Sequence, residues 1–140
     1  MINYTLNSIK GKKDFDFVFK NAKKFFEPDA AAFVCYKSGE ILANEVDSDD
    51  ITISYAVTVR KKMAKKAVVR NRIKRLLRVC FRQIFDEYAG KGQKSPISYI
   101  VVVWQNAPKH PGLINLDTCM PVARKLINRA NNHYSKKVRE

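Results

Sequence analysis

The sequence has no long hydrophobic run, few cysteines and few glycines, and each shortage excludes a class of protein. The longest apolar run, Tyr99–Trp104, is far shorter than the roughly 20 residues of a membrane-spanning helix. Residues 1–6 lack a basic flank followed by an apolar stretch, so we expect no secretory signal, no membrane partner and a cytoplasmic protein. The cysteines form no Cys-x-x-Cys pair, which argues against a disulfide framework or a zinc site. They are Cys35, Cys80 and Cys119.

A catalytic set is also lacking. The sequence has no credible paired carboxylates, no Ser/His/Asp or Cys/His arrangement, no glycine-rich phosphate loop and no metal-ligand spacing. The two histidines, His110 and His133, stand in polar surroundings without neighbouring ligands. We therefore expect the chain to carry no catalytic residue and no metal site, so that a partner would supply any reaction.

Acidic residues are absent from one strongly basic segment. The 140 residues include 27 Lys and Arg against 13 Asp and Glu, a formal net charge of +14. Eleven of the basic residues and none of the acidic ones lie between Arg60 and Arg82. A charge of this size favours a polyanionic partner. Because 46% of the residues are hydrophobic, we expect one folded domain over residues 1–140 rather than a disordered basic tail.

Periodicity predicts a mixed α/β domain. Residues 51–59 alternate strictly between apolar and smaller polar side chains, which is typical of a half-buried strand. Further strands are expected at 31–36, 41–46 and 97–104. Helices are expected at 14–24, 67–88 and 118–134. The termini, 1–8 and 135–140, are expected to be flexible.

The helix expected at 67–88 has an apolar face and a basic face. The apolar residues between Ile73 and Tyr88 fall in one arc that should pack on the sheet. The opposite face places like charges three and four residues apart, which costs stability, and its arginines suit two-point binding of phosphate. These features favour nucleic acid as the partner. The residues predicted to bind it are Lys61, Lys62, Lys65, Lys66, Arg70, Asn71, Arg72, Lys74, Arg75, Arg78 and Arg82.

Aromatic residues near the start of the chain leave two interpretations open. Phe15 and Phe19 are four residues apart, the spacing of a helix stripe that faces a core. The same rings, together with Phe33 and Tyr36, could stack on unpaired RNA bases if they lie on the surface beside the basic helix. The spacing alone favours the core.

Taken together, these motifs resemble the bacterial ribonuclease P protein component family, over about residues 9–130. The basic motifs that carry the resemblance are Thr58–Lys62, Ala67–Arg78 with its Arg70-Asn71-Arg72, and Phe81-Arg82. The apolar ones are Asp14-Phe15 with Val18-Phe19-Lys20, Phe33–Tyr36 and Ile100–Val103. The chain departs from the family at Trp104-Gln105-Asn106, where an Ala-Arg pair is usual.

The resemblance implies a two-layer α/β sandwich of order α-β-β-β-α-β-α, with a four-stranded sheet and a left-handed strand-helix-strand crossover. It implies an accessory subunit of ribonuclease P, the endoribonuclease that removes the 5′ leader of precursor tRNA. The RNA partner would carry out hydrolysis with Mg²⁺ that it mainly binds itself. The basic helix would contact this catalytic RNA. A cleft would bind the single-stranded leader through Phe15, Phe19, Tyr36 and Thr58.

Two other functions remain open. A ribosomal-type RNA-binding protein would use the same helix on rRNA without supporting a reaction. A DNA-binding helix-turn-helix protein would need a short helix and a tight turn before the basic helix, where the sequence has the strand at 51–59. We therefore expect no DNA partner, and we expect no obligatory protein partner.

Overall fold

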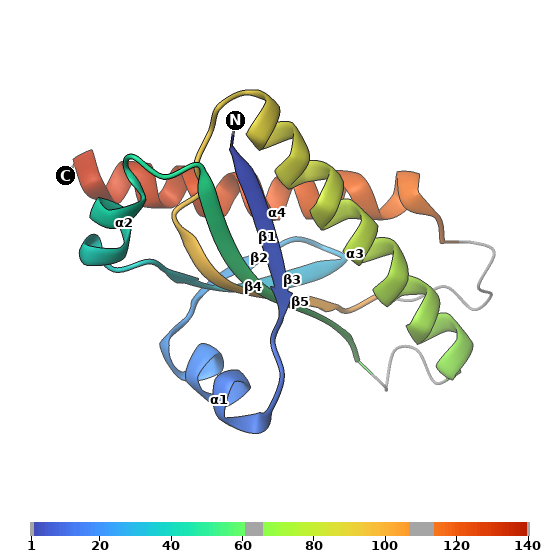
Figure 1. The fold of residues 1–140 in the computed structure, drawn as a ribbon. Coiled ribbons are helices and arrows are strands. Elements are labelled where there is room, and N and C mark those ends of the chain that lie inside the picture. Colours follow the sequence, from blue (N-terminus) through green and yellow to red (C-terminus); the bar gives the residue numbers. More distant parts are fainter. Residues whose placement is uncertain (1, 61–65, 107–113, 140) are drawn as a thin grey trace.

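The computed structural model has a five-stranded sheet with helices on both of its faces (Figure 1). It describes residues 2–60, 66–106 and 114–139. None of the helices in these ranges combines the length and the hydrophobicity that a membrane span requires. The elements, in chain order, are β1 (Asn3–Ser8), α1 (Lys12–Asn21), β2 (Lys23–Phe26), β3 (Ala30–Tyr36), α2 (Gly39–Glu45), β4 (Asp50–Val59), α3 (Ala67–Gly90), β5 (Ile97–Trp104) and α4 (Leu116–Arg139).

The strands lie in the order β1-β4-β5-β3-β2. The β1 and β4 strands are parallel, as are β4 and β5, whereas β3 is antiparallel to both β5 and β2. Parallel neighbours need a long crossover connection, and α3 provides it between β4 and β5. The structure thus has the strand-helix-strand unit that the resemblance implied, while its left hand stays a prediction.

The main core lies between the sheet and the helices α3 and α4. The strict alternation in β4 is confirmed, because Ile51, Ile53, Val57 and Val59 are all buried in this core. From α3 the core receives Val69, Ile73, Leu77, Cys80, Phe81, Ile84 and Phe85. Most of the arc predicted for this helix is therefore correct.

Helix α1 covers part of the opposite face of the sheet. Its Val18 is fully buried and packs with Ile9, Cys35 and Val101 in a second, smaller core. The α/β class is thus confirmed, but the sheet has helices on both sides rather than on one (Figure 1).

The expectation of a four-stranded sheet is wrong, because two short edge strands were not predicted and one of the four expected strands is a helix. Residues 1–8 were expected to be flexible, but β1 pairs along β4, and its Tyr4 is buried against Phe85 with ring centroids 5.2 Å apart. The helix expected at 14–24 ends at Asn21. Lys23–Phe26 then forms β2, which buries Phe25 in the main core.

The strand expected at 41–46 is helix α2. Ser38 caps it by accepting a hydrogen bond from the Ile41 backbone N–H at 3.2 Å, and Lys37 pairs with Glu45 at 2.9 Å. Helix α4 also differs from its predicted bounds. It begins at Leu116 and reaches Arg139, a stretch whose end was expected to be flexible.

Candidate RNA interface

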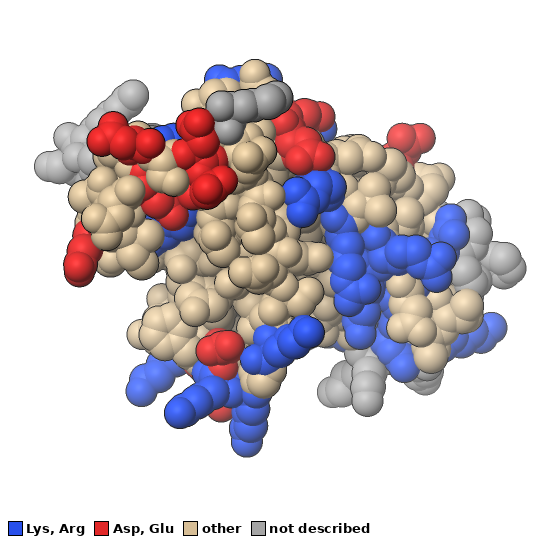
Figure 2. Space-filling view, in the orientation of Figure 1, with Lys and Arg blue, Asp and Glu red and all other residues tan. Residues whose placement is uncertain are grey.

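The first candidate surface is the basic face of α3, defined here by Arg70, Asn71, Arg72, Lys74, Arg75, Arg78 and Arg82. Figure 2 shows Lys and Arg side chains gathered in a stripe over this helix. The opposite side of the helix is fixed in the main core, so the cations are held on a rigid support. Lys66, just before the helix, is exposed. Lys61, Lys62 and Lys65 lie outside the described residues.

The cations of this face are not equivalent. Arg72 Nε donates a hydrogen bond to the Ile114 carbonyl at 2.9 Å, and Arg82 Nη1 donates one to the Tyr4 carbonyl at 3.1 Å. Both are thus partly occupied in holding the fold together. Arg75 and Arg78 are exposed and make no hydrogen bond or ion pair with another described residue. They are therefore the guanidinium groups most available to phosphate.

The second candidate surface, the aromatic face, lies on the α1 side of the sheet and consists of Phe15, Phe19, Phe33 and Thr58. Phe19 is 44% exposed, stacks on Phe15 with centroids 6.3 Å apart, and meets Phe33 edge-on at 4.9 Å. Neither ring of the α1 pair is fully buried, so the spacing argument for the core is only partly right.

Thr58 joins the aromatic face and Tyr36 does not. Val57 and Val59 point into the main core, so Thr58 between them points to the α1 side. Tyr36 packs against the main core instead, where its hydroxyl donates to the Ala130 carbonyl of α4 at 2.6 Å. The predicted leader-binding set is therefore divided between two faces of the sheet.

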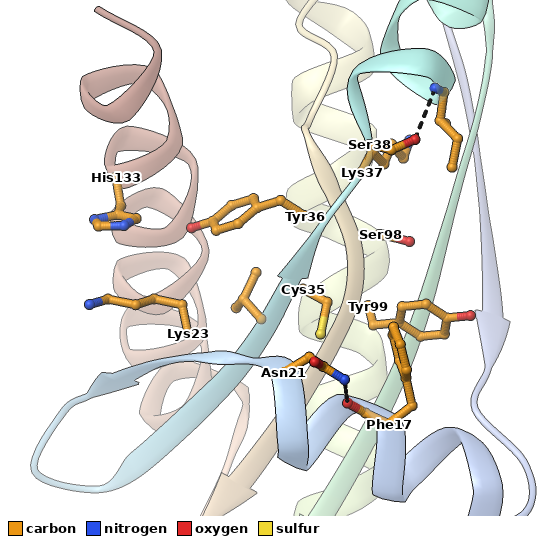
Figure 3. Close-up of a pocket in the computed structure, with 12 residues that line it drawn as sticks. Phe17, Asn21, Lys23, Cys35, Tyr36, Lys37, Ser38, Ser98, Tyr99 and His133 are labelled. Carbon is orange, nitrogen blue, oxygen red and sulfur yellow. Dashed lines mark hydrogen bonds between the residues drawn. The ribbon is translucent and has the colours of Figure 1, made fainter. Parts of the chain in front are cut away.

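Tyr36 lines a separate cavity of about 540 Å³ near the end of β3 (Figure 3). The strand β2 begins at Lys23, opposite Val34, so the last two residues of β3 have no partner on that edge. Phe17 and Tyr99 lie close together at one side of the cavity, with ring centroids 5.8 Å apart. His133 and Tyr36 lie at the other side.

The groups around this cavity suit binding better than catalysis. Burial raises the pKa of Tyr36 to about 12 and also raises the pKa of the Cys35 thiol, so both are protonated at neutral pH. The Lys37 ammonium is held by both carboxylate oxygens of Glu45. Nowhere in the described ranges do three or more His, Cys, Asp or Glu side chains gather as a metal site would need.

A second cationic segment was missed by the sequence reasoning. Residues 10–24 contain six lysines and only two acidic residues, a ratio that was visible in the sequence. Figure 2 shows their charges around α1. Lys24 Nζ lies 5.7 Å from the ring centroid of Phe33, a cation–π arrangement that puts positive charge directly on the aromatic face. The aromatic residues predicted from the sequence also did not include Phe17, whose side chain is 52% exposed.

Acidic residues gather on and beside α2, away from the basic stripe on α3 (Figure 2). They are Glu40, Asp47, Asp49 and Asp50. An approaching polyanion would thus be repelled from this end and attracted to α3 and α1.

Comparisons with known proteins agree on one family. The family model described as ribonuclease P matches residues 5–130. The ribonuclease P protein component of Prochlorococcus marinus is 32% identical over 55% of this chain, and the match spans 60% of that protein. The component of Rickettsia typhi is 32% identical over 68% of this chain and 77% of its own length. The Staphylococcus aureus RNase P protein has the same fold, with a TM-score of 0.59 and 20% identity over 88% of this chain and 94% of that one.

Proposed function

The chain belongs to the ribonuclease P protein family, and from that premise we propose that it is the protein subunit of ribonuclease P. In this role it binds the catalytic RNA and the 5′ leader of precursor tRNA, and it promotes endonucleolytic removal of the leader in the cytoplasm. The chain itself supplies no catalytic residue to the reaction.

The basic face of α3 is the observation that carries the proposal. A helix whose solvent side holds several cations and no acid between Arg60 and Arg82 gives up favourable ion pairs. Such a loss is explained if the face meets a partner with closely spaced negative charges. The phosphates of a folded RNA provide them, and guanidinium groups bind phosphate at two points.

The aromatic face supports the second half of the proposal. Single-stranded RNA is bound by aromatic rings that stack on its bases together with cations that follow its backbone, and such binding tolerates many sequences. Phe19 with Phe33 provides rings, and Lys24 provides a cation beside them. A leader that varies in sequence suits this kind of surface.

We assign the Mg²⁺ of the reaction mainly to the partner RNA. The protein would act by bringing two polyanionic RNAs together, since its cations offset their mutual repulsion. A complex with less repulsion needs fewer divalent ions to form, so the protein is expected to lower the Mg²⁺ concentration at which cleavage occurs.

Reconstitution tests the proposal. The full chain is mixed with a bacterial ribonuclease P RNA at a Mg²⁺ concentration at which that RNA alone is inactive, and 5′ cleavage of precursor tRNA is measured. We expect the protein to restore cleavage at the mature 5′ end. If the chain binds the RNA but cleavage is not stimulated, the proposal is wrong and an RNA-binding role of ribosomal type becomes the better account.

A further inference from the structure

Phe26 is a large exposed aromatic residue that the proposed function has not used. It is the last residue of the edge strand β2 and is 59% exposed. Its neighbour Phe25 points into the main core on the α4 side, so Phe26 points to the other side of the sheet. Phe26 therefore shares the side of the sheet on which Phe33, Phe19 and Thr58 lie.

The turn that follows Phe26 is held by its own backbone hydrogen bonds and by the residues that follow β5. The backbone of Glu27 and Ala30 closes a tight turn through hydrogen bonds of 2.9 and 3.3 Å. From the end of β5, the Gln105 N–H donates to the Asp29 carbonyl at 2.8 Å, and the Asn106 amide donates to the Asp29 carboxylate at 2.9 Å. These contacts give a structural role to the Gln105-Asn106 pair, at which the chain departs from the family pattern.

A second tether comes from α4. Arg129 Nη1 donates a hydrogen bond to the Phe26 carbonyl and lies 3.5 Å from a carboxylate oxygen of Glu27. The Phe26 carbonyl is thus held by Arg129 of α4, the strand is held by the pairing of β2 on β3, and the turn after Phe26 is held by the residues that follow β5. An exposed aromatic ring on so constrained a backbone loses little conformational freedom when it binds a ligand.

Phe26 stands at one end of a row that crosses the sheet. It pairs with Ala31, which pairs with Val103, which in turn pairs with Thr58. Four neighbouring strands carry this row, so it spans about 14 Å. It runs from the β2 edge to the end of β4, where Arg60 follows Val59. The ends of β4 and β5 and the β2–β3 turn lie on the same side of the molecule (Figure 1).

Charge complementarity indicates what this row binds. Lys24 stands on the same side of β2 as Phe26 and covers Phe33, and the exposed Arg60 lies beyond the far end of the row. A polyanion with aromatic bases can contact the cations and the rings together. An apolar peptide would leave the cations unused, and a paired helix would hide its bases from the rings.

We infer that Phe26 is a further base-stacking residue for the single-stranded leader, held in position by the hydrogen-bonded β2–β3 turn. The inference rests on the proposed function and extends it to the edge of the sheet. Thr58 lies near the end of β4, the strand that precedes α3, and α3 is the proposed contact with the catalytic RNA, so leader nucleotides near the cleavage site would occupy the Thr58 end of the row. Nucleotides farther along the leader would reach Phe26.

The test compares Phe26→Ala and Phe26→Leu with the unchanged protein in the reconstituted holoenzyme. Leucine keeps an apolar side chain but has no ring face. The measured quantity is the Kd for three substrates: precursor tRNA with a long leader, precursor tRNA with a two-nucleotide leader, and mature tRNA. Val46→Ala is the control, because it shortens another exposed apolar side chain, one that is 68% exposed beside the acidic end.

We expect both Phe26 variants to bind the long-leader substrate about fivefold or more weakly, from the loss of one stacked base. Their Kd for the short-leader and mature substrates should stay unchanged, as should every Kd of the control. Asn106→Ala should cause a smaller loss with the long leader, because it loosens the turn without removing the ring.

Two results would overturn the inference: equal long-leader affinity in Phe26→Leu and the unchanged protein, or an equal loss on all three substrates. Because these measurements use a holoenzyme that already cleaves precursor tRNA, either result leaves the proposed function standing. A failure of the proposed function would appear earlier, as an absence of stimulated cleavage by the unchanged chain.

Discussion

The basic face of α3 and the aromatic face beside α1 lie on elements that pack on opposite sides of one sheet, and they differ in chemistry. The first carries guanidinium groups on a helix whose other side is fully buried. The second carries partly exposed rings with a lysine over one of them. Charge attracts any RNA, whereas rings require bases that are free to stack. The difference indicates that the two faces bind different parts of the RNA.

Both faces depend on the core that holds them, so a substitution in that core should destabilise both faces together. Phe81 is fully buried in α3, with its ring 5.3 Å from that of Tyr55. Phe81→Ala is expected to lower the free energy of unfolding by about 3–5 kcal/mol, as measured by denaturant titration. Val79→Ala, on the exposed side of the same helix, should change it by less than about 0.5 kcal/mol. If Phe81→Ala and Val79→Ala lowered the free energy of unfolding equally, Phe81 would not lie on the buried side of α3 as described.

Removing cations from α3 should weaken RNA binding without altering the preference for a leader. In Arg75→Ala/Arg78→Ala, the slope of log K against log salt for the catalytic RNA should fall by about two units. The ratio of Kd values for mature and precursor tRNA should stay constant. Lys125→Ala, which removes an exposed cation from α4, provides the control. A changed ratio with an unchanged slope would assign leader binding to α3.

Removing a ring from the aromatic face should have the complementary result. Phe19→Ala is expected to weaken binding of precursor tRNA by about 1–3 kcal/mol, the value of one stacked base, and to leave the salt slope nearly unchanged. Affinity for mature tRNA should be retained. Since Phe19 is 44% exposed, Phe19→Ala should lower the midpoint temperature of thermal unfolding far less than Phe81→Ala does. A large loss of stability with unchanged discrimination would identify the ring as a core residue.

The Tyr36 hydroxyl should contribute to stability alone, because it is already bonded to Ala130. Tyr36→Phe is expected to cost about 0.5–1.5 kcal/mol of unfolding free energy and to leave leader discrimination within about twofold. Burial raises the Tyr36 pKa from 10.0 to about 12, so the folded protein keeps a proton that the unfolded chain loses. Stability from this group is full below pH 10 and is lost as pH rises toward 12. The alkaline loss should be shallower in Tyr36→Phe, as urea titrations at each pH would show.

Long, regular patterns made much of the fold predictable from the sequence. The alternation of residues 51–59 and the periodicity of the basic helix gave β4 and α3 nearly at their observed bounds. The short elements were missed because their patterns are too brief. In β1 only Tyr4 and Leu6 point inward, and β2 has a single buried residue. Pairing with β4 and β3 stabilises these strands, and such long-range contacts leave little trace in local sequence.

The candidate site was predictable in its charges but not in its geometry. The acid-free stretch identified the basic face, yet it could not separate Arg75 from Arg72, whose hydrogen bond goes to Ile114, 42 residues away. The assignment of Tyr36 to the same surface as Phe19 and Thr58 came from resemblance. Side chains alternate along β3, so Tyr36 lies with Val34 on the main-core face, whereas Phe33 and Cys35 lie on the α1 face. The three-residue spacing of Phe33 and Tyr36 in one strand already indicates opposite faces, but which of the two faces α1 covers is a tertiary contact that this spacing does not contain.

The Mg²⁺ dependence of cleavage tests the central claim most directly. Precursor tRNA cleavage is titrated with Mg²⁺ for a bacterial ribonuclease P RNA alone, with the unchanged chain, and with the Arg75→Ala/Arg78→Ala variant. The account predicts that the chain moves the midpoint to lower Mg²⁺ and that the variant moves it back toward the value for RNA alone. A midpoint that the unchanged chain does not move would contradict the account.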